Sequence, residues 1–138
     1  MANIVPDSFK TDTLKGTFNF KSAAQGGGST FKIALFTSLG GFSTSTTTYT
    51  GAANEVANGS GYTTGGNTLT NNGVAVASNI AYVDFANTTW SSASITAVGA
   101  LIYKSSSNEA VLVLDFGGTK TSTNGDFEIA FPAATSSD

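Results

Sequence analysis

The chain has 138 residues, of which 40% are hydrophobic and 11% are charged, with a formal net charge of −3 and neither cysteine nor histidine. This is the length of one domain that can bury a packed core. Without an imidazole or a thiolate, the Ser-His-Asp and Cys-His constellations and the usual zinc sites are excluded, and most hydrolase mechanisms lose their base.

All six cations are lysine, and the chain is acidic overall. Nucleic-acid binding draws its affinity from neutralised phosphates, so we expect no nucleic-acid partner. No apolar run approaches the roughly 20 residues that cross a bilayer, and the N-terminus lacks the basic start and apolar segment of a signal peptide. We therefore expect a protein that is made in a cytoplasm and has no membrane contact.

Residues 5–16 carry the helix signal of the chain, and residues 1–16 are predicted to form a short helix or arm. Pro6 suits the first helical position, Asp7 favours the N-terminal end, and Gly16 is placed to end the helix. The apolar side of this helix is thin, so it must dock on something to be stable. Two interpretations stay open: a lid on its own domain, or an arm that docks on another protein.

Strand patterns begin after this arm. Residues 17–21 alternate phenylalanine with polar residues and predict a strand, which a Gly-rich turn ends. Residues 30–37 alternate again and predict a strand buried on one face. Residues 40–66 are rich in Ser, Thr and Gly and predict a long loop that packs at points, among them Tyr49 and Tyr62. This loop is either a binding element or an ordered insertion that closes one end of the fold.

The second half of the chain predicts more strands. Residues 97–103 and 110–116 are apolar at successive positions, which predicts a central hairpin with both faces covered. Residues 80–85 are also apolar on both faces, which predicts a strand with both faces covered. Residues 68–77 predict a strand end, a turn at Asn71-Asn72-Gly73 and a short strand. Residues 126–131 alternate apolar with charged side chains and predict a half-exposed edge strand.

These segments amount to roughly eight short strands separated by Gly, Asn and Ser turns. The predicted fold class is therefore all-β, a single β-sandwich of jelly-roll or Greek-key type with a short N-terminal helix or arm. The predicted organisation is an arm over residues 1–16, a sandwich domain over 17–132 and a flexible tail over 133–138.

Acidic residues are the remaining candidates for acid/base chemistry. Asp84 and Asp115 both follow apolar strand residues, so a shared carboxylate site is conceivable, as is a hard-cation site that adds Asn87. The ordinary role of such carboxylates is to accept hydrogen bonds from turn amides, and we expect no catalytic residue, metal or cofactor. Trp90 and Tyr62 would stack on sugars if exposed, but such residues in a sandwich are more commonly buried.

Several blocks of the sequence resemble small virion structural proteins of tailed bacteriophages. The blocks are residues 1–20, 61–66 with Leu69, 84–85 with Trp90, 95–103, 114–118, 124–127 and 131–132. Similar strand and turn blocks occur in head decoration (cement) proteins and in tail or fibre accessory modules. The resemblance implies a non-enzymatic β-sandwich subunit that assembles on a phage particle, and it carries over no functional residues.

The expected function is that of a capsid decoration protein on the outer surface of the expanded head, where it would be a closed homotrimer with the major capsid protein as its partner. Residues 4–20 of the N-terminal region and residues 44–66 of the long loop would touch the coat. The expected partner-binding residues are Ile4, Val5, Phe9, Lys10, Leu14, Lys15, Tyr49 and Tyr62. The alternative is a tail or fibre module that binds a host glycan or another tail protein. A third class, a carboxylate-dependent glycosidase, would need Asp84 or Asp115 in an open cleft.

Overall fold

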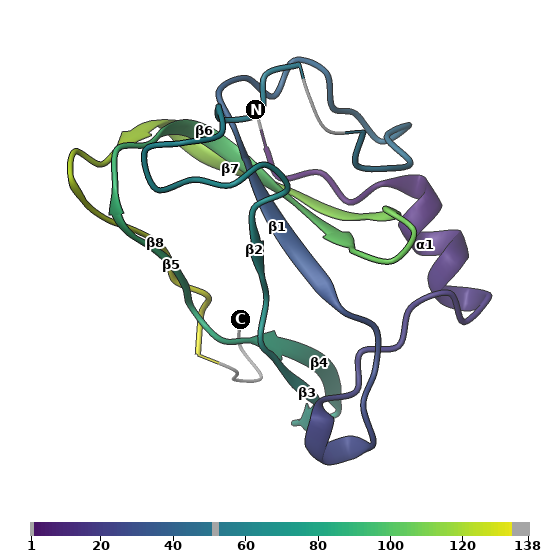
Figure 1. Ribbon diagram of the computed structural model, residues 1–138. Helices are drawn as coiled ribbons and strands as arrows, with labels where there is room; N and C mark the ends of the chain where they lie inside the picture. Colours follow the sequence, from purple (N-terminus) through teal and green to yellow (C-terminus); the bar gives the residue numbers. More distant parts are fainter. Residues whose placement is uncertain (1, 51–52, 134–138) are drawn as a thin grey trace.

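The computed structural model describes residues 2–50 and 53–133 of the chain (Figure 1). The helical elements are α1 (Asp7–Leu14) and the short 3-10 helix η1 (Ala23–Gln25). The strands are β1 (Phe31–Phe36), β2 (Asn67–Thr68), β3 (Asn71–Ala77), β4 (Ile80–Phe85), β5 (Thr88–Ala93), β6 (Thr96–Lys104), β7 (Ala110–Thr121) and β8 (Gly125–Ile129). The strand pairs are antiparallel, and the predicted all-β, sandwich-like fold is confirmed.

The largest sheet has the strand order β2-β1-β6-β7. β6 and β7 form the predicted hairpin, in which Leu101 lies opposite Val113. Both residues are fully buried, as expected for strands that are apolar at successive positions. The predicted central position of the hairpin holds for β6 alone, because β7 is the last strand of the sheet. β1, which pairs with β6, is also buried on both faces, whereas its sequence predicted burial on one. The second face is covered because Ala34 and Phe36 pack against the loop that follows β1.

Two apolar clusters lie on the two faces of this sheet. On one face, Ile33 and Ile102 pack in a cluster that includes Trp90 of β5 and Phe127 of β8. These two aromatic residues are register partners in the separate β5–β8 pair, so that pair closes the larger cluster. On the other face, the smaller cluster is closed by residues of the loop after β1 and by Ile4. The N-terminal segment and the loop are therefore structural parts of the domain.

β8 has the predicted alternation. Phe127 is buried, while Asp126 and Glu128 are exposed, so the charged side of the strand faces solvent. β8 pairs with β5 alone among the described strands, which agrees with its prediction as a guarded edge strand.

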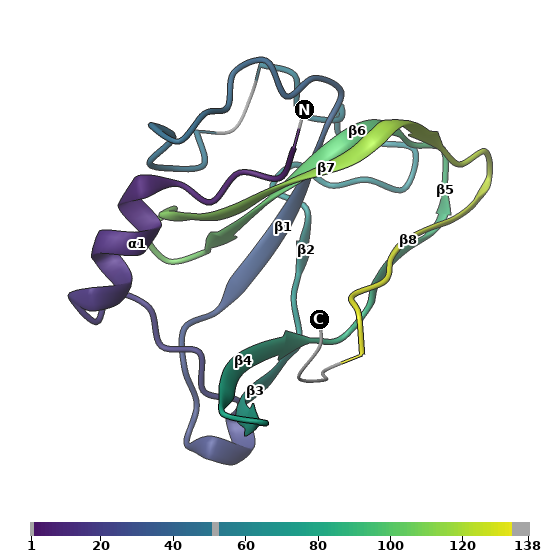
Figure 2. The ribbon, with the colours of Figure 1, turned by 180° about the vertical axis from the view of Figure 1, so that it is seen from behind.

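β3 and β4 form a two-stranded sheet at one end of the molecule, a placement that Figures 1 and 2 show from both sides. Two predictions for this region are wrong. The predicted turn at residues 71–73 is the first part of β3, with a register shift between Asn71 and Gly73, and the actual turn is Ser78-Asn79. Both turn residues have positive φ, 49° and 66°, as a two-residue hairpin turn requires. β4 was predicted to be covered on both faces, but it is mostly exposed because β3 is its sole neighbouring strand in the described residues.

The predicted strand over residues 17–21 is also absent from the described structure, since this segment pairs with no strand. Asn19 instead bonds to Ser29: its carbonyl accepts the Ser29 N–H at 2.8 Å, and its own N–H donates to the Ser29 hydroxyl at 3.1 Å. The alternating phenylalanines still pack in the core: the ring centroids of Phe18 and Phe20 lie 6.4 and 4.8 Å from that of Phe31, on which both rings stack. Residues 134–138 of the predicted tail lie outside the described residues.

Candidate functional site: partner-binding surfaces

The N-terminal arm is fastened to the main sheet before the helix begins. The N–H of Ile4 donates to the carbonyl of Val113, and the N–H of Val113 donates back to Ile4, both at 2.9 Å. This pair is an isolated antiparallel bridge that adds the arm to the edge of β7. Ile4 also packs against the smaller apolar cluster. This predicted partner-binding residue therefore contacts its own domain.

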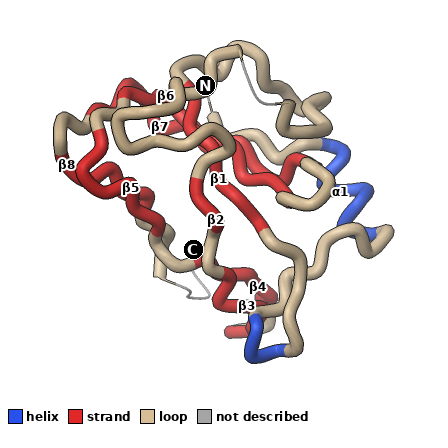
Figure 3. Tube along the Cα trace, in the orientation of Figure 1, coloured by secondary structure: helices blue, strands red, loops and turns tan. Residues whose placement is uncertain are grey.

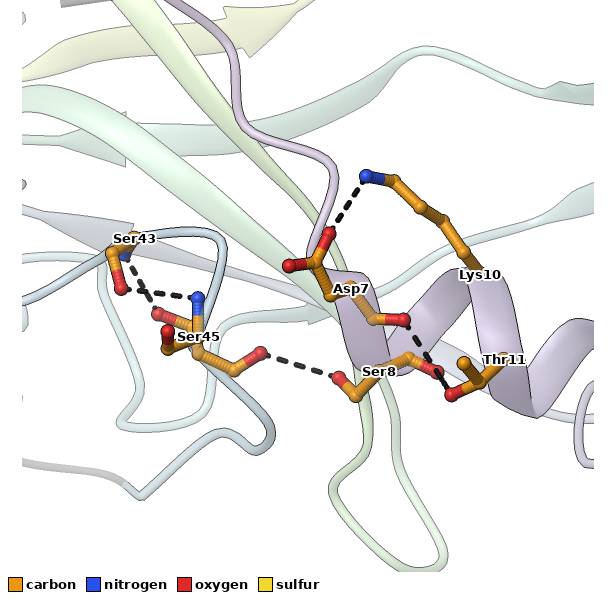
Figure 4. Close-up of polar contacts among 7 residues, drawn as sticks. Asp7, Ser8, Lys10, Thr11, Ser43 and Ser45 are labelled. Atoms are coloured by element: carbon orange, nitrogen blue, oxygen red, sulfur yellow. Dashed lines mark hydrogen bonds and ion pairs between the residues drawn. The ribbon is translucent and has the colours of Figure 1, made fainter.

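α1 is held by polar contacts to the long loop (Figure 4). The Ser8 hydroxyl donates to the carbonyl of Thr46 at 3.2 Å, and the N–H of Asp7 donates to the carbonyl of Thr44 at 2.8 Å. On the inner side, Phe9 packs on Phe18 with the ring centroids 5.1 Å apart. Of the two interpretations of the arm, these contacts favour a lid on its own domain for its inner face, Phe9 included.

The outer face of the arm carries the remaining predicted residues. Leu14 is 91% exposed and Val5 is 41% exposed, which are large values for aliphatic side chains. Lys10 and Lys15 are exposed and form ion pairs within the helix, with Asp7 at 2.8 Å and Asp12 at 3.4 Å. Lys10 and Leu14 are four residues apart, so they share one helix face. This face could contact a partner without disturbing the domain.

Tyr49 and Tyr62 meet at one carboxylate, that of Glu55. The Tyr62 hydroxyl donates to Glu55 Oε1 at 2.7 Å, and the Tyr49 hydroxyl donates to Oε2 at 2.8 Å. The Gly65 N–H donates to Oε1 at 2.7 Å as a third partner. Tyr49 also stacks on Tyr103 of β6, with ring centroids 4.2 Å apart. These contacts fix the long loop, drawn in tan between β1 and β2 in Figure 3, onto the main sheet.

This cluster, Tyr49, Glu55, Tyr62 and Tyr103, keeps its phenols protonated well above neutral pH. Burial raises the pKa of Tyr103 to about 12, with the Glu55 charge adding to the effect. Burial, reinforced by the hydrogen bond to Glu55, also raises the pKa values of Tyr49 and Tyr62 above the usual value of tyrosine. Tyr62 is only 2% exposed. It has no surface to offer a partner in this conformation, and Tyr49 is half-buried.

The two aspartates considered for chemistry have separate partners. The Asp84 carboxylate accepts a hydrogen bond from the Asn72 side chain at 2.7 Å within the β3–β4 sheet. Asp115 accepts the N–H of Gly117 at 2.9 Å, and this hydrogen bond lowers the pKa of the Asp115 carboxyl. The amide oxygen of Asn87 accepts a backbone N–H beyond β8. Residues 2–50 and 53–133 contain no group of three acidic residues arranged to hold a metal ion.

Trp90 is 3% exposed and packs between aromatic side chains. Its ring lies 6.1 Å from that of Tyr62 and 6.1 Å from that of Phe127. The more common buried role of these aromatics is therefore the observed one, and a sugar-stacking platform of Trp90 and Tyr62 is not present on the described surface.

Sequence reasoning missed the exposed apolar surface of the β3–β4 hairpin. Val74, Val76, Ile80 and Val83 are 42%, 69%, 49% and 39% exposed. The apolar run of β4 was visible in the sequence and predicted burial, but whether a strand is covered depends on its neighbouring strands, which the run itself does not reveal.

No family model matches the chain, and comparison with curated proteins and with solved structures finds no significantly similar protein. No helix in the described part of the chain is long and apolar enough to span a membrane.

Proposed function

We propose that the protein is a non-enzymatic phage virion structural protein, a capsid decoration (cement) protein that binds the outer surface of the expanded head. Its sandwich domain, of jelly-roll or Greek-key topology, forms a closed homotrimer whose partner is the major capsid protein. The resemblance of residues 1–20, 61–66, 95–103 and 114–118 to phage structural proteins motivates this proposal. The few charges of the chain, 11% of its residues, suit close packing against neighbouring subunits.

The observation that supports the proposal best is the exposure of Leu14. A leucine that is 91% exposed adds nothing to the packing of its own domain. It lies at the end of a helix whose other side is fixed by Phe9 and by hydrogen bonds from Asp7 and Ser8. A rigid helix that presents one apolar side chain between lysines is a preorganised contact for another protein surface.

The mechanism is mass action. A subunit that binds the expanded lattice and not the unexpanded or disassembled coat stabilises the expanded state by RT ln(1 + [L]/Kd) for each site. A decoration subunit that bridges two neighbouring coat subunits opposes the dissociation of either coat subunit from the lattice. This process involves no chemical reaction, so it requires no imidazole base, and the chain has no histidine.

The test is co-sedimentation with expanded, decoration-free heads and with unexpanded heads. Wild-type protein is expected to sediment with expanded heads, and Leu14→Asp is expected to stay in the supernatant. Thr13→Asp is the matched control, because it places the same charge on a neighbouring exposed position. Equal binding of Leu14→Asp would remove the arm from the contact, and no binding of wild-type protein to heads would reject the proposed function.

The alternative, a tail or fibre module that binds a host glycan or another tail protein, depended on exposed aromatic residues side by side. Tyr62 and Trp90 are 2% and 3% exposed, so the two aromatic side chains that were expected to stack on a glycan are buried. Binding to another tail protein would use the same outer face of α1, and tails are therefore included beside heads in the binding experiments.

A further inference from the structure

The β3–β4 hairpin has the properties of an incomplete sheet. Two-stranded hairpins are marginally stable in water, and a third or fourth strand usually supports them. Here Val74, Val76, Ile80 and Val83 are all at least 39% exposed. The described part of the chain supplies no further strand to this sheet.

The two edges of the hairpin differ. The outer edge of β3 is occupied by the side chain of Gln25 in η1. Its amide nitrogen donates to the carbonyl of Val74 at 2.9 Å, and its amide oxygen accepts the Val74 N–H at 3.1 Å. One amide side chain thus takes the place of a neighbouring strand at Val74. A new strand could pair with β3 only by displacing it.

The outer edge of β4 has no such cap in the described residues. Val83 lies opposite Val74, whose backbone groups point away from β4 towards Gln25. Two directly opposed residues in an antiparallel pair either bond to each other through their backbone N–H and C=O groups, or both point these groups away from the pair. The N–H and C=O of Val83 therefore point outward, and those of Ala81, two residues earlier, do the same.

We propose that β4 pairs, antiparallel, with β4 of a second copy of this chain, with Tyr82 on the two-fold axis. Ala81 of each copy then lies opposite Val83 of the other, and both use the backbone groups that point outward. The result is a four-stranded sheet in the order β3-β4-β4-β3. Because the contact is isologous, the same short segment serves both partners.

The segment is self-complementary in this register. Asp84 lies opposite Ile80 of the other copy, so the two carboxylates do not face each other, and Tyr82 faces Tyr82 as an aromatic cross-strand pair. Ile80 to Val83 contain no charge or proline that would guard an edge, unlike β8 with its two exposed carboxylates.

An axis one residue further, at Val83, is disfavoured by the fold. It would place Ala81 of the second copy opposite Phe85, which is 8% exposed and packs on Phe131 with ring centroids 6.0 Å apart. The incoming strand would then run against the body of the domain. The axis at Tyr82 keeps the pairing residues, Ala81 and Val83, in the exposed part of β4.

The inference does not rest on the proposed function, and the surface is separate from the outer face of α1. A protein that pairs through β4 but ignores phage heads would keep this inference and reject the decoration role. If the protein is a trimer, pairing through β4 joins two trimers.

Single cysteines test the register directly, because the chain has none of its own. In the proposed pair, two cysteines from Tyr82→Cys have Cα atoms about 4.5 Å apart, a distance that a disulfide spans. Two cysteines from Ile80→Cys are separated by about 13 Å along the strands. Under mild oxidation, Tyr82→Cys is expected to form a covalent dimer on a denaturing gel and Ile80→Cys to stay a single chain. No dimer with either variant, or equal dimer with both, overturns the proposal.

Proline variants test the two edges. Ala81→Pro removes an outward N–H from the β4 edge, and Val76→Pro, at the position opposite, removes one from the β3 edge. Light scattering is expected to give Ala81→Pro half the particle mass of the wild type and Val76→Pro the wild-type mass. Circular dichroism checks that both variants are folded. A wild-type mass that is unchanged on dilution and equal to that of a folded Ala81→Pro variant overturns the proposal.

Discussion

The hydroxyl of Tyr62 donates a hydrogen bond to Glu55 at 2.7 Å while it accepts one from the backbone N–H of Leu35 at 3.0 Å. It thereby joins two parts of the long loop to Leu35, near the end of β1. Glu55 itself lies beside β1, because its neighbour Val56 donates its N–H to the carbonyl of Leu35 at 2.9 Å. The loop is a fixed part of the domain at this point, although its composition is that of a flexible segment.

Tyr62→Phe is expected to destabilise the domain by about 2 kcal/mol, because it leaves the buried N–H of Leu35 without its acceptor and removes one of the two hydrogen bonds that Glu55 Oε1 accepts. Chemical denaturation measures this loss. Tyr82→Phe also removes a tyrosine hydroxyl, but from the exposed β3–β4 hairpin, and it is expected to change the unfolding free energy by less than about 0.5 kcal/mol. Similar effects of the two variants would mean that the Tyr62 hydroxyl bonds are not formed in solution.

The stability of the domain should fall at alkaline pH. The pKa of Tyr103 is about 12 in the folded protein against 10.0 for an unperturbed tyrosine, and those of Tyr49 and Tyr62 are also raised. The unfolded chain therefore loses these protons first. Their contribution is complete below pH 10 and is lost progressively as the pH rises from 10 to 12 and beyond. Tyrosinate absorbance and circular dichroism, followed together, should show these tyrosines ionising as the protein unfolds. Ionisation of all four tyrosines near pH 10 in a folded protein would contradict this.

The two apolar side chains of α1 should behave differently. Phe9→Ala is expected to cost about 2 kcal/mol, because the ring packs on Phe18 and Phe20. Leu14→Ala is expected to change stability by less than about 0.5 kcal/mol, since the side chain is 91% exposed. Thermal unfolding of the two variants provides the comparison. A large loss with Leu14→Ala would mean that Leu14 is covered within the free protein.

Gly66 is expected to tolerate no side chain. Its φ is +75°, and a Cβ would overlap the carbonyl group of Ile33 in β1. Gly66→Ala should therefore cost at least about 2 kcal/mol, or prevent folding. Gly41→Ala is the control, because Gly41 has no positive φ and, among the described residues, no atom lies within 4 Å of its added Cβ. An unchanged melting temperature for Gly66→Ala would contradict the close approach of this loop to β1.

The sequence predicted the elements whose pattern is local. The β6–β7 hairpin could be predicted because residues 97–103 and 110–116 are apolar at successive positions and a polar link separates them. The helix at Asp7–Leu14 followed from its end signals, with the difference that Pro6 precedes the first turn as its N-cap. These signals depend on residues close together in the chain.

Features that depend on distant partners could not be predicted. Whether the apolar run of β4 was covered depended on where the other strands lie, and the Gln25 cap joins residues 49 apart in the chain. The meeting of Tyr49 and Tyr62 at Glu55 depended on the path of a loop with no strand pattern. The partner-binding role of the exposed residues Val5, Lys10, Leu14 and Lys15 stays a prediction.

Electron microscopy of the protein mixed with expanded, decoration-free heads and with tails tests the proposed function most directly. The decoration role predicts regular added density on the outer surface of the head lattice, absent from unexpanded heads and from tails. Density on tails alone, or on neither particle, would contradict it.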